Sequence, residues 1–113
     1  MKAITTKDAH AQFTNYLKDK KRSTSTIVAY GKDIQQLVTF LEELSKNHIH
    51  EVTKEDIESF LAKLSKKGYT PKSISRKLNS ARTFYRFLKV NEYVTDDPSL
   101  LVAHPQYQLA APR

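Results

Sequence analysis

The sequence predicts an all-α protein: a compact bundle of four helices followed by a short fifth helical turn and a C-terminal linker tail. The chain has only two glycines and four prolines in 113 residues. A β-sandwich would need turn signals roughly every 8 to 12 residues. Apolar residues instead recur three and four positions apart in four segments, which is typical of amphipathic helices. This length suits one domain with a single core.

The first helix is predicted over Thr6 to Lys21. Its apolar stripe consists of Ala9, Phe13, Tyr16 and Leu17. The segment ends in a run of basic residues, broken only by Asp19, that comprises Lys18, Lys20, Lys21 and Arg22. Cations near a helix C-terminus are favoured by the helix dipole, which accounts for much of this run.

The second helix is predicted to begin within residues 23–26, where four hydroxyl side chains supply candidate N-caps, and to stop at residues 45–47. Its apolar stripe consists of Ile27, Tyr30, Ile34, Leu37, Val38, Leu41 and Leu44. This long stripe predicts a helix that packs against the rest of the bundle along most of its length.

The third helix begins at Thr53, which forms a capping-box pair with Asp56, and Gly68 is expected just beyond its end. Thr70 and Pro71 mark the start of the fourth helix, which fades at Asn91. Its apolar face contains Ile74, Leu78, Ala81, Tyr85 and Leu88. A short helical turn is expected over residues 99–102, and residues 104–113 have no periodicity.

The formal net charge of +7 is unevenly distributed. Between Thr70 and Val90 the fourth helix contains six basic residues and no acidic one. A helical wheel places Lys72, Arg76, Asn79 and Thr83 opposite its apolar face. Ser73 and Ser80 lie on one flank and Ser75, Arg82 and Arg86 on the other, and the wheel alone does not choose between the flanks. Such a face suits a helix in the major groove of DNA, where basic side chains meet phosphates or guanine edges.

Several other functions are disfavoured by what the sequence lacks. There is no cysteine, no glycine-rich phosphate loop and no pair of histidines at metal-binding spacing, so we expect no cofactor, no metal and no catalysis. No signal peptide or membrane span is expected, and the apolar faces are needed for the core, so a membrane surface is an unfavourable partner. The composition fits a cytoplasmic protein. An acidic protein remains an alternative partner to DNA.

Four segments, taken in order, resemble the core-binding domain of tyrosine recombinases. Residues 25–34 (STIVAYGKDI) are similar to the T-x-x-x-Y-x-x-D-[LI] signature of its second helix, and residues 73–88 to its last long helix. Residues 97–99 (DPS) resemble the element that closes the domain, and residues 104–105 (HP) lie where the interdomain linker begins. The chain is therefore identified as a member of the phage integrase family, most similar to its Xer-type recombinases.

The resemblance implies a SAM-like orthogonal bundle over residues 1–102 and an interdomain linker over residues 103–113. Such a domain forms half of a C-shaped clamp on double-stranded DNA, at a recombination half-site. A separate catalytic domain of the full-length protein, absent from this chain, would cut and join the strands. In the family such proteins act as tetramers on DNA, and the isolated domain is expected to be a monomer.

Residues expected at the major groove are carried over from the family: Ser25, Thr26, Lys32, Lys72, Ser73, Arg76, Lys77, Ser80 and Thr83. Two other functions stay open at this point. The chain could be an all-α protein-interaction module whose basic face binds an acidic partner, or a stand-alone integrase-derived DNA-binding regulator.

Overall fold

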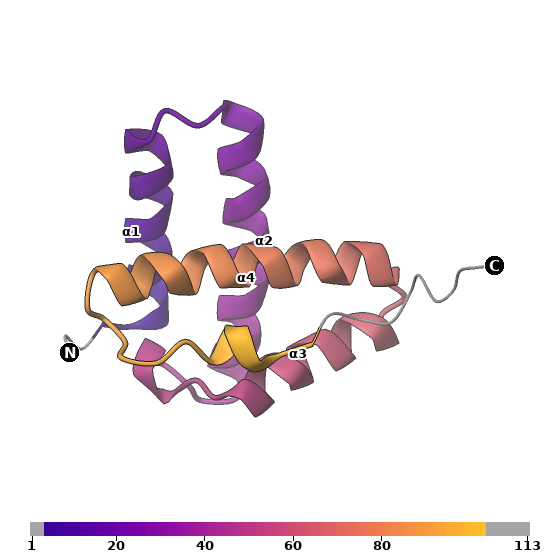
Figure 1. The fold of residues 1–113 in the computed structure, drawn as a ribbon. Coiled ribbons are helices and arrows are strands. Elements are labelled where there is room, and N and C mark those ends of the chain that lie inside the picture. The colour runs from indigo at the N-terminus through magenta and orange to yellow at the C-terminus, as the bar shows by residue number, and fades with distance from the viewer. Residues whose placement is uncertain (1–3, 104–113) are drawn as a thin grey trace.

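The chain forms four α-helices and two short 3-10 helices, seen in a computed structural model that describes residues 4–103 (Figure 1). The elements are α1 (Thr6–Asp19), α2 (Thr24–Glu43), η1 (Ile49–Glu51), α3 (Lys54–Lys66), α4 (Pro71–Val90) and η2 (Pro98–Leu101). The all-α prediction is confirmed. Residues 104–113, and with them nearly all of the predicted linker, lie outside the described residues.

The helices α1 and α2 form an antiparallel hairpin, and α4 crosses the front of this hairpin at a steep angle (Figure 1). Below α4 lie α3 and η2. The upper half of the hairpin extends beyond α4, so the α2 helix and α4 meet in a corner. In the described part of the chain, no helix is long and apolar enough to cross a membrane.

The helix boundaries are set by local capping, largely as predicted. Ser23 accepts a hydrogen bond from the Thr26 amide at 3.2 Å at the start of α2, and Thr70 accepts one from the Ser73 amide at 3.1 Å at the start of α4. These contacts satisfy amides that have no partner inside the helix. Thr53 and Asp56 form the predicted capping box of α3. Gly68, with φ +94°, lies just beyond the α3 C-cap, where positive φ favours glycine.

Three details differ from the prediction. The first helix ends at Asp19, because Lys21 takes the left-handed conformation with φ 56°. Leu44 was predicted in the apolar stripe of α2, but it is the C-cap residue and is 41% exposed. The short η1 helix was not predicted, since three residues carry no periodicity.

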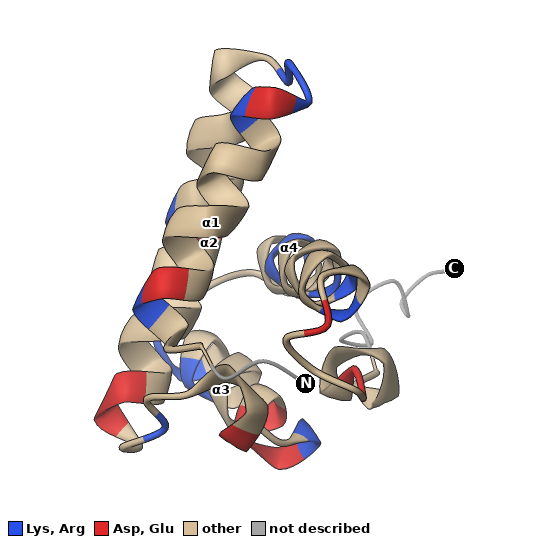
Figure 2. Cartoon of the chain, turned by 90° about the vertical axis from the view of Figure 1, so that its left-hand side faces the viewer, with Lys and Arg blue, Asp and Glu red and all other residues tan. Residues whose placement is uncertain are grey.

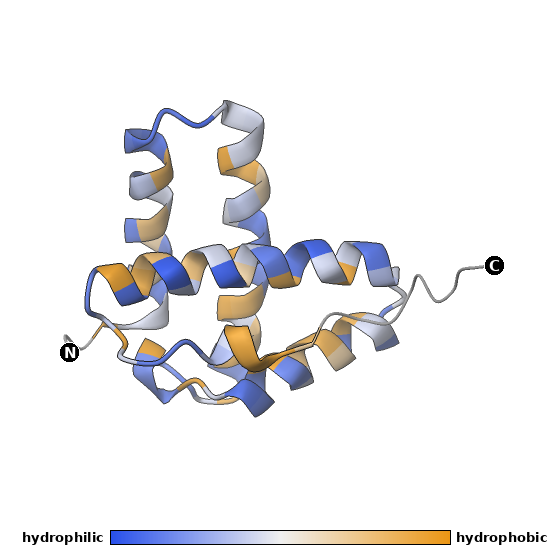
Figure 3. Cartoon of the chain, viewed as in Figure 1, coloured by the Kyte–Doolittle hydropathy of each residue, from blue (hydrophilic) through white to orange (hydrophobic). Residues whose placement is uncertain are grey.

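The core is centred on an aromatic cluster that joins three helices. Phe13 of α1 is fully buried, and its ring lies 5.3 Å from that of Phe84 and 5.6 Å from that of Phe87, both on α4. The Tyr30 ring of α2 meets Phe13 edge-on at 6.1 Å. Figure 3 shows polar residues alternating with apolar ones along α4, whose apolar side packs on this cluster.

We expect Phe13→Ala to lower the free energy of unfolding by about 3 to 5 kcal/mol, because it removes a fully buried ring and leaves a cavity in the aromatic cluster. Val28→Ala, at a position that is 48% exposed, is the control and should change stability by less than about 0.5 kcal/mol. Urea unfolding followed by circular dichroism measures both. Equal losses for the two variants would contradict this description of the core.

Candidate nucleic-acid interface

An open hollow of about 360 Å³ lies at the surface, in the corner between α2 and α4. The residues lining it are Thr26, Ala29, Tyr30, Asp33, Arg76, Asn79 and Ser80. Three of the residues predicted to contact DNA are among them: Thr26, Arg76 and Ser80. Folding therefore brings together two sequence segments that were assigned to the interface separately.

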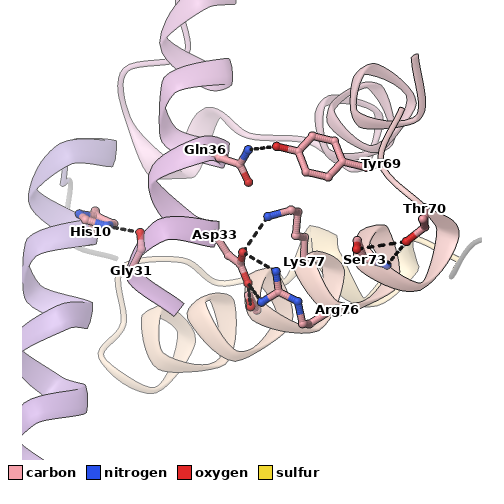
Figure 4. A network of polar contacts seen from close by, with 10 residues as sticks. His10, Gly31, Asp33, Gln36, Tyr69, Thr70, Ser73, Arg76 and Lys77 are labelled. Atoms are coloured by element: carbon pink, nitrogen blue, oxygen red, sulfur yellow. Dashed lines mark hydrogen bonds and ion pairs between the residues drawn. The ribbon is translucent and has the colours of Figure 1, made fainter. Parts of the chain in front are cut away.

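A buried carboxylate lies at the base of this corner (Figure 4). Asp33 of α2 is 3% exposed and receives four hydrogen bonds from α4. Lys77 Nζ donates to Oδ1 at 2.9 Å, and Ser80 Oγ donates to Oδ2 at 2.7 Å. Arg76 donates from Nη1 to Oδ2 at 3.0 Å and from Nη2 to Oδ1 at 3.4 Å. This arrangement fixes the position of α4 on α2.

Lys77 and Ser80 face the interior of the domain. Lys77 is 8% exposed, and its ammonium group lies 5.2 Å from the centre of the Tyr69 ring in addition to its ion pair with Asp33. The Tyr69 hydroxyl accepts a hydrogen bond from Gln36 at 3.0 Å. Ser80 is 3% exposed. In this structure both residues stabilise the α2–α4 contact from beneath the surface that a ligand would meet.

Arg76 differs from Lys77, because its side chain is 55% exposed. The guanidinium group carries five N–H donors in a rigid plane, and the contacts with Asp33 engage Nη1 and Nη2. The Asp33 carboxylate thus orients the group, while other donors remain available at the hollow. Arg76 is the one predicted basic residue that both lines the hollow and is fixed in position by a buried partner.

The remaining predicted residues lie at or near the surface. Lys72, Ser25 and Lys32 are exposed, and Ser73 and Thr83 are half-buried. The hydroxyls of the last two bond within α4 or its cap: Ser73 accepts from Thr70 at 3.1 Å, and Thr83 donates to the Asn79 carbonyl at 3.1 Å.

The helical wheel does not show which flank of α4 faces α2, but the contacts of Arg82 and Ser80 do. The Arg82 guanidinium group donates to the Ser99 carbonyl at 3.3 Å and to the Val102 carbonyl at 2.7 Å, which anchors the η2 segment on α4. Ser80 lies on the opposite flank, against Asp33. The Ser73 and Ser80 side, rather than the Arg82 side, therefore faces the α2 corner.

Acidic residues elsewhere form structural ion pairs. Asp56 pairs with Lys46 at 2.9 Å; partial burial opposes its ionisation, but hydrogen bonds from Lys46 and Thr53 hold its pKa below the usual value. The Glu43 pKa is lowered by its hydrogen bond and charge interaction with Lys63, at 2.8 Å. Figure 2 shows the acidic residues on other elements, whereas α4 carries only basic charge.

Tyr85 is the most deeply buried tyrosine of the described chain, and its hydroxyl has no hydrogen-bond partner there. Burial raises its pKa far above the ordinary value of about 10, with the charges of Asp97 and Asp56 adding to the effect. A hydroxyl that stays protonated and inaccessible is a poor nucleophile. Residues 4–103 also contain no group of three or more side chains able to hold a metal ion.

The described chain is thus an orthogonal helical bundle whose last long helix has basic residues, no acidic residue, and lies against a second helix. Residues 11–92 match the family described as phage integrase, N-terminal SAM-like domain, and the chain belongs to that family. The SAM-like bundle predicted from the sequence is confirmed.

Individual relatives are tyrosine recombinases. The chain is 33% identical over 103 residues to tyrosine recombinase XerC of Listeria welshimeri, covering 90% of this chain and 34% of that protein. It is 34% identical over 88 residues to tyrosine recombinase XerD of Caulobacter vibrioides, covering 78% of this chain and 28% of the relative. The chain thus spans about a third of the length of the curated relatives it matches.

The fold has a solved counterpart. The N-terminal domain of a phage integrase/site-specific recombinase from Haloarcula marismortui superposes with a TM-score of 0.85 over 93% of this chain and all of that one. At 12% sequence identity, this likeness concerns the fold alone.

We expect Asp33→Asn to lower the free energy of unfolding by about 3 to 5 kcal/mol, because it leaves the Lys77 ammonium group buried without a counter-ion. Adding Lys77→Met should recover most of the loss, since the uncompensated charge is then removed. The three variants are Asp33→Asn, Lys77→Met and the double variant that carries both substitutions. Their chemical denaturation, compared with that of the unsubstituted chain, gives the coupling energy between the two positions.

Glu43→Gln serves as the control, because it breaks an exposed ion pair and should change stability little. If Asp33→Asn proved as harmless as Glu43→Gln, the buried network would not hold α4 on α2.

Proposed function

We propose that this chain is the DNA-binding, core-binding domain of a site-specific tyrosine recombinase of the integrase or Xer type. In this proposal it grips a recombination half-site through the major groove with the α2–α4 corner. The observation that carries the proposal is the acid-free basic face of α4, which meets the N-terminal half of α2 around one hollow. Membership of the integrase family supports it.

The chemistry of the corner suits double-stranded DNA. Exposed Lys72 and Lys32 do not line the hollow but lie on the same two helices and supply charge for phosphates. Ser25, Thr26, Ser73 and Thr83 supply short hydroxyl groups. Arg76, oriented by Asp33, has the planar donor geometry that bases and phosphates both accept. Lys77 and Ser80 stay in the proposal as positioning residues, because they hold Asp33, and through it Arg76, from beneath the surface.

The division of labour in the full-length protein is also proposed. The present chain binds DNA without cutting it, and a catalytic domain of the same polypeptide exchanges strands through a phosphotyrosine. Residues 1–102 then form the DNA-binding unit and residues 103–113 the linker. The full-length protein acts as a tetramer on DNA in the cytoplasm, whereas the isolated domain is a monomer.

Binding should be weak and strongly salt-dependent. If about five phosphates are neutralised, the logarithm of the association constant should fall with the logarithm of salt concentration at a slope near −4.5. Lys72→Ala should make this slope less steep by about 0.9. Fluorescence anisotropy with a labelled duplex, between low salt and physiological salt, measures both values.

Lys66→Ala is the matched control, because it removes the same charge from the exposed C-terminal turn of α3 and should leave the slope unchanged. An absence of binding even at low salt would contradict the proposal and favour the protein-interaction module.

A further inference from the structure

A second basic surface lies at the turn that joins α1 to α2, far from α4 in the sequence. It consists of Lys18, Lys20, Lys21 and Arg22, and we call it the hairpin tip. All four side chains are exposed. Asp19 is the one acidic residue within this run. Within the described residues none of the four basic side chains forms an ion pair, and Figure 2 shows blue basic segments at this end of the hairpin next to a red acidic one.

The helix dipole accounts for only part of this charge. Lys18 lies in the last turn of α1, where a cation is favoured, but the other three residues follow the end of the helix. Lys21 has φ 56°, a left-handed conformation that glycine adopts freely and that Ser45 and Glu92 also take in the described chain.

The structure also places the tip on the side of the hairpin where α4 lies. In Figure 2, where α4 is seen end-on, the hairpin leans so that its tip stands above α4. The hairpin meets α4 at Asp33, nine positions after Thr24, the first residue of α2. At 1.5 Å per residue, the tip lies about 14 Å along α2 from that contact.

The separation of about 14 Å between the tip and the α2–α4 contact is similar to the width of the major groove of DNA, which is about 12 Å. A corner that sits in the groove at Arg76 therefore carries the tip to the rim of the groove, where the phosphates of the backbone lie. Lysine and arginine side chains that form no salt bridge are suited to such a contact, because they can bind phosphates and release counterions without breaking an ion pair.

We infer that the hairpin tip is a second DNA contact, which binds the phosphate backbone at the rim of the groove occupied by α4. This inference rests on the proposed function and extends its contact surface beyond the residues predicted from the sequence. The tip contributes affinity and salt dependence but no base preference, since phosphates are the same at every site.

The test compares two double variants with equal change in charge. Lys20→Gln/Lys21→Gln removes two charges from the tip, and Lys7→Gln/Lys66→Gln removes two from exposed positions on α1 and α3. Binding of the whole chain to a fluorescein-labelled duplex of about 20 base pairs is followed by anisotropy across salt concentrations. We expect the tip variant to make the slope less steep by about 1.8, at 0.9 per lost phosphate contact.

The control variant should keep the slope of the unsubstituted chain. Circular dichroism verifies that both variants fold, which matters because Lys20 also lies over the Tyr16 ring at 5.7 Å. If both variants keep the slope, or both lose it equally, the inference about the tip is wrong while DNA binding by the domain stands. Failure of the unsubstituted chain to bind the duplex would overturn the proposed function itself.

Discussion

The ion pair and hydrogen bonds of Asp33 are the interaction on which the rest of this structure depends. One buried carboxylate on α2 receives four hydrogen bonds from three side chains of α4, so the two helices cross at a fixed point. A carboxylate without partners at this depth would cost several kcal/mol, and so would the buried Lys77 ammonium group if Asp33 were lost. The corner and its hollow exist because this contact sets both the position and the rotation of α4.

The same contact separates the basic residues of α4 into two groups. Arg76 and Lys77 are neighbours in the sequence but point about 100° apart on the helix, so one reaches the surface and the other lies beneath it. These two adjacent basic residues therefore differ in role. The Arg76 guanidinium group is exposed to a partner, whereas the buried Lys77 ammonium group stabilises the fold. Arg82, further along, anchors η2 and belongs with the structural group. The basic surface available to a partner is smaller than the charge of the helix suggests.

The sequence predicted those features that depend on near neighbours. The caps at Ser23, Thr53 and Thr70 and the positive φ at Gly68 follow from residues within four positions of one another. The burial of Lys77 and Ser80 was missed, because their partner lies more than 40 positions away and a helical wheel gives direction without distance. One signal was present: Asp33 is the single acidic residue between Ser23 and Leu41, opposite a helix that has none.

In the proposed function, the α2–α4 corner is the surface that meets DNA. An NMR titration of the isotope-labelled chain with a short duplex at low salt, following each backbone amide, tests it most directly. We expect chemical-shift changes at residues 25–33 and 72–83 and at the hairpin tip, and none along the exposed side of α3. Shifts confined to α3 and η2, or an unchanged spectrum, would contradict it.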